Sequence, residues 1–297
     1  MVGTGLFARG FGVALGVILF AVPAGPQTKV ERALGDLIRT TEDRMDARIG
    51  VHVHQAGSDW AWEHRGGERF LMASVFKSVL CGAVLAAADR GALDLDEPLE
   101  IRPGEIHSHA PVTRPRAGQT MTVSDLCLAT LDQSDNGAAN LLIDRLGGPG
   151  AVTSFLRAIG DDTTRLDRKE PDVNIFAPGD PRDTTTPSAI AATWQNLLLG
   201  DALSADSRGR LTRWMSLGGV TQALIRPHVP AGWAVADKSG GGRGYTRNIV
   251  AMLSPGPEEH YLVAIFLSDT PADWEARNAA VSDVAGAVVA LIRERRQ

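Results

Sequence analysis

Ser74 and Lys77 have the residue types and the spacing of a nucleophile and its base, three positions apart in Ser74-Val75-Phe76-Lys77. They open a stretch that is predicted to be helical, so both side chains lie on one face, about one turn apart. At a helix start the serine oxygen lies near unpaired backbone N–H groups, and the lysine can lower the cost of removing the serine proton. The pattern also fits an ordinary helix start with a solvated lysine, because a chain of this length contains about one such pair by chance.

Two further polar groups follow along the chain, Ser134-Asp135-Asn136 in a predicted loop and Lys238-Ser239-Gly240 on a predicted strand. The first could bring a hydroxyl and an amide beside Ser74, or it could form a turn or N-cap for a helix that begins near residue 138. The second could hold a carboxylate in a cleft, or it could end an edge strand with a solvated lysine. The three motifs in this order are much more specific than any one of them.

Together the three motifs resemble those of the class A serine β-lactamases and penicillin-binding proteins. The resemblance to class A β-lactamases covers essentially the whole chain after residue 24. Within the wider group, the segment Glu170-Pro171-Asp172-Val173-Asn174 favours a β-lactamase. A carboxylate and an amide four positions apart in one loop can hold the water that hydrolyses an acyl-enzyme ester. An ordinary charged surface loop is the alternative.

The resemblance implies roles for the reactive residues. Ser74 would be the nucleophile, and Lys77 would assist its deprotonation. Glu170 would be the general base for the deacylating water, and Ser134 would pass a proton to the leaving nitrogen. Whether Lys77 or Glu170 takes the proton during acylation is disputed for the family. Arg168 and Asp183 are similar to the ion pair that closes the Glu170 loop in the family.

The resemblance also implies a substrate-binding set. Backbone N–H groups of Ser74 and Gly241 would form an oxyanion hole, in which losing one donor typically costs about 3–4 kcal/mol of barrier. His109 falls where the family often has an aromatic residue at the mouth of the cleft. The expected binding residues are Asn136, Asn174, Lys238, Ser239, Gly240, Gly241 and Arg247.

Cys81 and Cys127 are the only cysteines. Two cysteines cannot build a structural zinc site, but they can form one bridge. They match the disulfide pair found in part of the family, and such a bridge would contribute roughly 4 kcal/mol in the chain-entropy model. Two buried free thiols are the alternative.

Residues 1–24 are predicted to be a secretory signal peptide. Arg9 precedes an uncharged, mostly apolar stretch, 10–22, and the small residues of Val22-Pro23-Ala24 suit cleavage after residue 24. A helix of the mature protein is the alternative. The apolar stretch is too short to cross a bilayer of about 30 Å. We therefore expect a periplasmic or secreted protein whose mature form has no membrane segment.

These residues need a scaffold, and the hydrophobic pattern indicates one with α and β elements in two lobes. Residues 28–45 and 281–292 have helical spacing, and the chain between 74 and 217 is mostly helical. Predicted strands lie near both chain ends, at 48–54, 60–63, 233–237, 247–253 and 261–267. The pattern predicts an antiparallel five-stranded sheet flanked by N- and C-terminal helices, with an all-helical lobe inserted. This is the fold of serine β-lactamases and DD-peptidases. The catalytic domain would cover 25–297, with an α/β lobe of about 25–70 and 218–297 and a helical lobe of about 71–217.

Composition excludes several classes of function. With 30 basic and 35 acidic residues among 297, the net charge of −5 gives no reason to expect a nucleic acid partner. The pairs His52/His54 and His107/His109 lack the remaining ligands of a zinc hydrolase, so no metal or organic cofactor is expected. The expected partner is a small β-lactam molecule, and the expected state is a monomer.

The sequence therefore predicts hydrolysis of penicillins, and of some cephalosporins, through a serine acyl-enzyme. One alternative is a penicillin-binding DD-peptidase or a β-lactam sensor that deacylates slowly. The other is an inactive binding protein on the same fold. Glu170 and Asn174 argue against the first, and the presence of every reactive residue argues against the second.

Overall fold

The computed structural model describes residues 27–106, 108–242 and 244–297. The predicted signal peptide, 1–24, lies outside the described residues. No helix in the described chain is both long and apolar enough to span a membrane.

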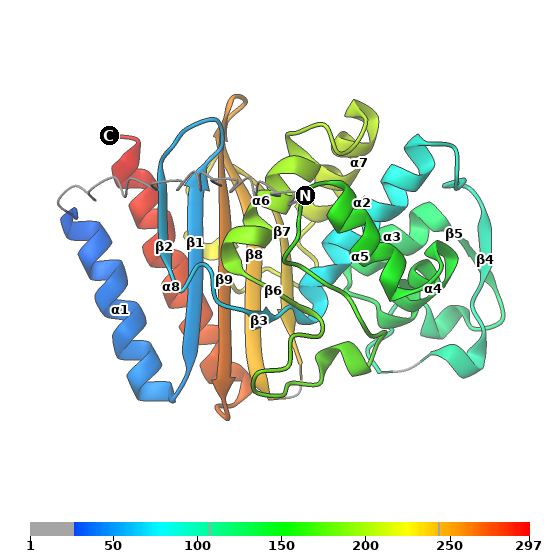
Figure 1. Cartoon of the computed structure of the whole chain (residues 1–297), viewed down its shortest axis with the longest axis horizontal. Helices are drawn as coiled ribbons and strands as arrows, with labels where there is room; N and C mark the ends of the chain where they lie inside the picture. Colours follow the sequence, from blue (N-terminus) through cyan, green and yellow to red (C-terminus); the bar gives the residue numbers. More distant parts are fainter. Residues whose placement is uncertain (1–26, 107, 243) are drawn as a thin grey trace, which may run out of the picture.

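A five-stranded antiparallel sheet forms the centre of the molecule, in the order β2-β1-β9-β8-β7 (Figure 1). Its strands come from the two ends of the chain, as the sequence predicts. They are β1 (Arg48–Gln55), β2 (Ala61–His64), β7 (Ala234–Gly241), β8 (Tyr245–Gly256) and β9 (Glu259–Thr270). The fold is the predicted two-lobed one, and it places β7 at the edge nearest the helical lobe.

Alternation along the strands gives the sheet two apolar faces. Ile249 and Ala251 of β8 lie in one core cluster, with residues of α1 (Lys29–Met45) and α8 (Trp274–Arg295). Val250 and Met252 lie in the other cluster, with residues of the helical lobe. Because successive side chains of a strand point to opposite faces, the sheet separates these two cores. The helices α1 and α8 lie side by side on one face (Figure 1).

The helical lobe is built around α2 (Phe76–Asp89), whose residues from Phe76 to Ala87 are all buried. A helix that is apolar on all sides is stable only when others surround it. The surrounding helices are α3 (Val123–Asp132), α4 (Asn136–Leu146), α5 (Pro149–Ala158) and α7 (Ala205–Ser216). Ser74, in the short 3₁₀ segment Ala73–Val75 just before α2, is therefore held at the N-terminal end of this central helix.

Helix α6 (Pro187–Leu198) lies within the range predicted for the helical lobe, yet it packs against β1 and β9. It covers the sheet face opposite α1 and α8. Two small sheets were not predicted from the sequence, because their strands are only two or three residues long. They pair β3 (Phe70–Leu71) with β6 (Thr184–Thr185), and β4 (Pro98–Glu100) with β5 (Thr120–Thr122).

Candidate active site

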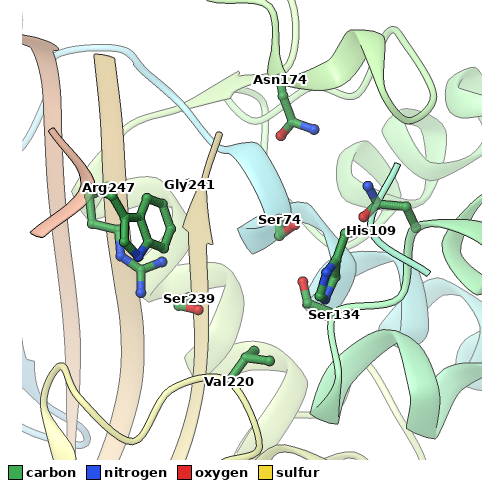
Figure 2. A pocket seen from close by; sticks show the side chains of 10 residues that line it. Ser74, His109, Ser134, Asn174, Val220, Ser239, Gly241 and Arg247 are labelled. Carbon is green, nitrogen blue, oxygen red and sulfur yellow. The ribbon is translucent and has the colours of Figure 1, made fainter. Parts of the chain in front are cut away.

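A cavity of about 270 Å³ lies where the helical lobe meets β7. Figure 2 shows Ser239, Gly241 and Arg247 on one side of it, and His109 and Ser134 on the other, with Ser74 between them. The cavity is lined by Ser74, His109, Ser134, Asn136, Asn174, Val220, Ser239, Gly241, Arg247 and Trp274.

The segment that carries Ser74 is fixed by strands β7 and β8. The side-chain amide of Asn248 donates hydrogen bonds to the carbonyls of Leu71 and Met72, at 2.9 and 3.0 Å. At Gly240 a Cβ atom would lie 2.4 Å from the Met72 carbonyl oxygen. Only glycine lets β7 approach so closely, so Gly240 acts by its lack of a side chain.

Lys77 is fully buried behind the cavity and connects three predicted site residues. Its Nζ donates to the Ser134 carbonyl at 2.7 Å, to Ser134 Oγ at 3.3 Å and to Asn136 Oδ1 at 2.6 Å. It also lies 3.3 Å from Glu170 Oε1. Burial lowers the pKa of the Lys77 ammonium, while the charge of Glu170 opposes this shift. Lys77 therefore gives up a proton more readily than a solvated lysine.

The Ser134-Asp135-Asn136 motif is both a helix cap and part of the site. Asp135 is buried and accepts hydrogen bonds from the Ala138 and Thr113 backbone N–H groups, each at 2.9 Å. It is the N-cap of α4, which begins at Asn136 rather than near residue 138. This cap fixes Ser134 and Asn136 on either side of Lys77.

Glu170 is buried in the loop that links α5 to α6, residues 159–186. Its backbone N–H donates to Asn140 Oδ1, and its carbonyl accepts from Asn140 Nδ2, both at 2.9 Å. Its Oε2 accepts from Asn174 Nδ2. Within the described chain, Glu170 Oε1 and Asn174 Oδ1 are buried acceptors without a hydrogen-bond partner, and the ion pair with Lys77 is the polar contact of Glu170 Oε1. Buried acceptors of this kind are costly unless a donor reaches them.

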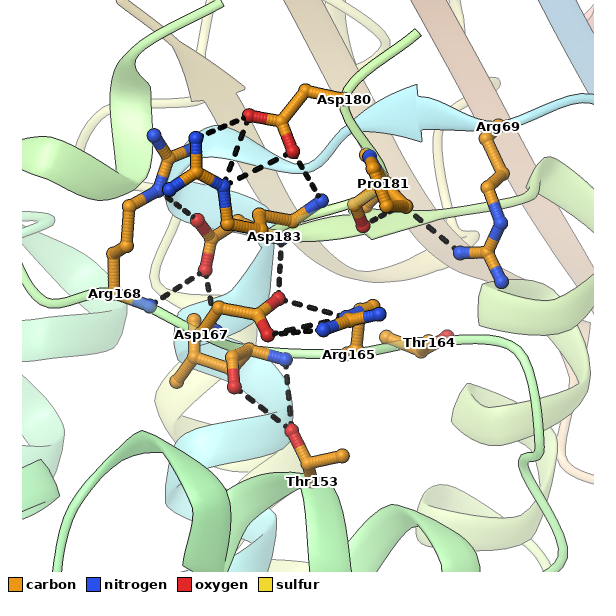
Figure 3. Close-up of polar contacts among 12 residues, drawn as sticks. Arg69, Thr153, Thr164, Arg165, Asp167, Arg168, Asp180, Pro181 and Asp183 are labelled. Atoms are coloured by element: carbon orange, nitrogen blue, oxygen red, sulfur yellow. Dashed lines mark hydrogen bonds and ion pairs between the residues drawn. The ribbon is translucent and has the colours of Figure 1, made fainter.

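Asp183 holds the two ends of this loop together (Figure 3). Its carboxylate accepts from Arg168 Nε, and from the backbone N–H groups of Asp167 and Arg168 at 2.6 and 2.9 Å. The Asp183 side chain is fully buried. Burial raises the pKa of Asp183, and these hydrogen bonds oppose the shift. The predicted pairing of Arg168 with Asp183 is present in the structure.

The side of the cavity formed by β7 and β8 carries the cationic side chains of Lys238 and Arg247. Lys238 is fully buried and donates to Ser134 Oγ at 3.1 Å. Burial lowers its pKa well below the ordinary value, and the charges of Lys77 and Arg247 lower it further. Burial, with the charge of Arg277, lowers the pKa of Arg247 to about 10. Cations with lowered pKa values are stabilised by an anion, so this wall suits a carboxylate.

The structure thus brings all of the predicted catalytic and binding residues to one place. Seven line the cavity: Ser74, Ser134, Asn136, Asn174, Ser239, Gly241 and Arg247. Lys77 forms an ion pair with Glu170, and both Lys77 and Lys238 donate hydrogen bonds to Ser134 Oγ.

Known proteins are similar to this chain in sequence and in fold. The model of the Beta-lactamase enzyme family matches residues 29–292. A β-lactamase from Rhodobacter capsulatus is 47% identical over 283 residues, which is 95% of this chain and 96% of that protein. The chain belongs to the class A β-lactamases.

Solved structures of β-lactamases superpose closely on this class A β-lactamase. One from Xanthomonas campestris pv. campestris has a TM-score of 0.86 at 43% identity, covering 89% of this chain and 98% of that chain. A class A β-lactamase of the last common ancestor of Gram-negative bacteria has a TM-score of 0.84 at 44% identity, covering 89% and 100% of the two chains.

The predicted disulfide of this β-lactamase is not confirmed. Cys81 and Cys127 are both buried and both free in the described chain. Cys81 Sγ lies 3.7 Å from the carbonyl oxygen of Cys127, which is a hydrogen-bonding contact rather than a sulfur–sulfur bond. Burial raises the pKa of the Cys81 thiol well above its ordinary value, so the thiolate is disfavoured. The alternative of two buried free thiols describes this structure.

The histidines of β1 form hydrogen bonds rather than a metal site. His52 Nε2 lies 3.1 Å from His54 Nδ1, and His54 Nε2 lies 2.7 Å from Gln195 Oε1. The described residues contain no group of three or more His, Cys, Asp or Glu side chains suited to a metal. His107 lies outside the described residues.

Sequence reasoning missed two residues that shape the cavity of this β-lactamase. Trp274 and Val220 line it, although neither belongs to a motif. Trp274 is the first residue of α8 and is 44% exposed. A large apolar residue just after a helix cap is the only sequence signal for it. Its contact with Arg247 depends on how α8 packs against β8.

Proposed function

We propose that this β-lactamase hydrolyses penicillins, and some early cephalosporins, through an ester on Ser74. Ser74 Oγ attacks the β-lactam carbonyl carbon after losing its proton to the Lys77–Glu170 pair, which lies 3.3 Å apart. The backbone N–H groups of Ser74 and Gly241 stabilise the oxyanion. The carbon–nitrogen bond then breaks, and Ser134 gives its proton to the nitrogen while it takes one from Lys77. Its hydrogen bonds with Lys77 and Lys238 support this role.

Deacylation uses Glu170 as the base. Glu170 Oε1 takes a proton from water while the water oxygen attacks the ester carbon, and the bond to Ser74 Oγ then breaks as that oxygen takes a proton back from the Lys77–Glu170 pair. The single observation that carries this proposal is that Glu170 Oε1 and Asn174 Oδ1, on two side chains hydrogen-bonded to each other, are buried acceptors without a hydrogen-bond partner in the described site. Buried acceptors of this kind suit a water molecule, which offers two donor hydrogens.

The cationic wall supports a substrate with a carboxylate. Lys238, Ser239 and Arg247 would bind it, and Asn136 would bind the amide of the substrate side chain. Asn136 Nδ2 donates to Ser108 Oγ at 2.7 Å, a bond that such an amide carbonyl would replace or share.

Turnover of a chromogenic cephalosporin tests this proposal. Purified protein should give many turnovers per enzyme, and Ser74→Ala should give none above background. A DD-peptidase or sensor would instead release at most about one equivalent of product before stopping. No turnover by the wild type would overturn the proposal.

We further propose that residues 1–24 direct export and that the mature enzyme is a periplasmic or secreted monomer. The intact mass of exported protein should correspond to a chain that begins after residue 24, and light scattering should give one chain per particle. An unprocessed mass would contradict the export proposal. Alkylation of the same protein, denatured but unreduced, reports whether Cys81 and Cys127 remain free outside the cytoplasm.

A further inference from the structure

Trp274 lies beside Arg247, on the side of the cavity that is proposed to bind the substrate carboxylate, and it belongs to none of the sequence motifs. It begins α8, and Asp273 caps that helix by accepting from the Ala276 N–H at 2.8 Å. The cap fixes the backbone of the first turn of α8, from which the indole extends with 44% of the residue exposed. Trp274 lines the cavity together with Ser74, Ser239 and Arg247.

The indole ring contacts the guanidinium of Arg247. The Arg247 Cζ atom lies 4.3 Å from the ring centroid, and that of Arg277 lies 5.5 Å from it. Each guanidinium is attracted to the ring, while the two cations repel each other. Both arginines are nearly buried, at 6% and 4% exposed, so these interactions are little screened by solvent.

Polar contacts alone leave Arg247 incompletely fixed. Its Nε donates to Asn278 Oδ1 at 2.6 Å, and its Nη1 donates to the Gly240 carbonyl at 3.2 Å. Its Nη2 makes no hydrogen bond within the described residues and is available to an anion. The ring restricts rotation of the guanidinium plane about these two anchors.

Trp274 also packs against the backbone of β7. A Cβ atom at Gly241 would lie 2.8 Å from the indole, so a larger residue there would force the ring to shift. The same side chain therefore contacts Arg247 and the strand that borders Ser74.

We propose that Trp274 is a positioning residue that holds the Arg247 guanidinium in the orientation that binds a substrate carboxylate. The proposal rests on the proposed function, because it concerns the carboxylate of the same β-lactam substrates. Trp274 determines specificity for substrates with a free carboxylate over neutral ones, and it acts through Arg247 rather than on the reacting atoms.

Steady-state kinetics with benzylpenicillin and its methyl ester test the proposal. Trp274→Ala should raise KM for the acid about tenfold, about 1.4 kcal/mol and within the range for a desolvated cation–π pair, while kcat changes less than about twofold. Trp274→Phe should recover most of the affinity because it keeps a ring. In Trp274→Ala, KM for the methyl ester, which lacks the carboxylate charge, should change less than about twofold.

A double-mutant cycle provides a second, independent readout. In an Arg247→Ala background, Trp274→Ala should raise KM for the acid no further, because the group that it orients is gone. The matched control is Trp233→Ala, which removes an indole that contacts Arg296 at 5.2 Å, away from the cavity. It should leave KM for the acid unchanged.

Two results would overturn the inference. One is an equal rise in KM for the acid and the ester in Trp274→Ala. The other is that Trp274→Ala raises KM for the acid as much in the Arg247→Ala background as in the wild type. Either would mean that Trp274 supports the fold or the whole cavity instead. Melting temperatures of all variants, with Trp274→Phe as the conservative replacement, separate loss of binding from loss of folding. If the wild type hydrolyses neither substrate, the proposed function itself fails.

Discussion

Two buried lysines, Lys77 and Lys238, both donate hydrogen bonds to Ser134 Oγ, and their environments differ. Lys77 has the Glu170 carboxylate 3.3 Å away, whereas Lys238 faces the positive charges of Lys77 and Arg247. The first arrangement suits proton transfer, since base and acid are adjacent. The second suits the capture of an anion, which would relieve the repulsion among cations.

The alkaline limb of the pH profile should report Lys238. Because its pKa is lowered, Lys238 loses its proton, and with it the carboxylate contact, at a lower pH than an ordinary lysine. For a carboxylate substrate, kcat/KM of the wild type should therefore fall below the usual lysine pKa of about 10.4. Lys238→Arg should move the fall to higher pH, because a guanidinium holds its proton more strongly than an ammonium does in the same surroundings. Identical alkaline limbs in both proteins would contradict this assignment.

Local motifs gave the reactive residues, whereas the supporting contacts could not be predicted from the sequence. Ser74 and Lys77 share one helical turn, and Glu170 and Asn174 share one loop, so spacing alone relates them. The contact of Trp274 with Arg247 and the close approach of Gly240 to Met72 join distant segments. No periodicity carries such information. The predicted bridge between Cys81 and Cys127 came from the resemblance alone, and the structure does not contain it.

At the level of elements, the Glu170 loop is positioned by side-chain contacts, among them the buried ion pair of Arg168 with Asp183, rather than by regular structure. Between α5 and α6 the chain contains only a 3₁₀ turn, Asp172–Asn174, and the two residues of β6. Asp183 therefore has a larger role than most acidic residues, because three donors from Asp167 and Arg168 converge on it.

Removing the cation of this pair should loosen the loop. Arg168→Ala leaves the buried charge of Asp183 uncompensated, which should lower the free energy of unfolding by about 3 kcal/mol. It should also slow turnover about 100-fold, because a shift of roughly 1 Å in Glu170 is enough to do so. Urea unfolding and kcat measure the two effects.

Arg182→Ala is the matched control, since it removes an exposed arginine of the same loop, paired with Asp180. An exposed pair of this kind contributes little, so stability and kcat should both stay near the wild-type values. Equal effects of the two substitutions would argue against a special role for the buried pair.

Strand prediction succeeded where short apolar runs are bounded by turn residues. In β8 and β9 such a run is continuous, and its alternate residues fill two separate cores, so the length of the run and the flanking turns, rather than a period of two, indicate the strand. The position of α6 on the sheet could not be predicted, because its apolar stripe shows only that one face is buried. Whether it packs on helices or on strands depends on the rest of the fold.

At the scale of the whole molecule, the two lobes share a core. One apolar cluster contains Val79 and Leu126 of the helical lobe together with Val250 and Phe266 of the sheet. The active site lies at the edge of this shared cluster, between β7 and the segment that carries Ser74. Its geometry therefore depends on both lobes being folded.

The shared core predicts a single cooperative unfolding transition. Far-ultraviolet circular dichroism, which follows the helices, and tryptophan fluorescence should give the same midpoint in urea. The residues from Phe76 to Ala87 are buried in that cluster or against it. Unfolding of the sheet would therefore expose apolar residues of the helical lobe to water. Two separate midpoints would show that the lobes unfold independently.

The central claim is that Ser74 is acylated and that Glu170 removes the acyl group. Intact mass spectrometry of Glu170→Ala after exposure to benzylpenicillin tests it most directly, with Ser74→Ala as the control for non-specific labelling. We predict a long-lived adduct of one penicillin on Ser74 in Glu170→Ala, and unmodified wild-type enzyme once the substrate is consumed. No adduct in Glu170→Ala, or an adduct that the wild type also keeps for hours, would contradict the account.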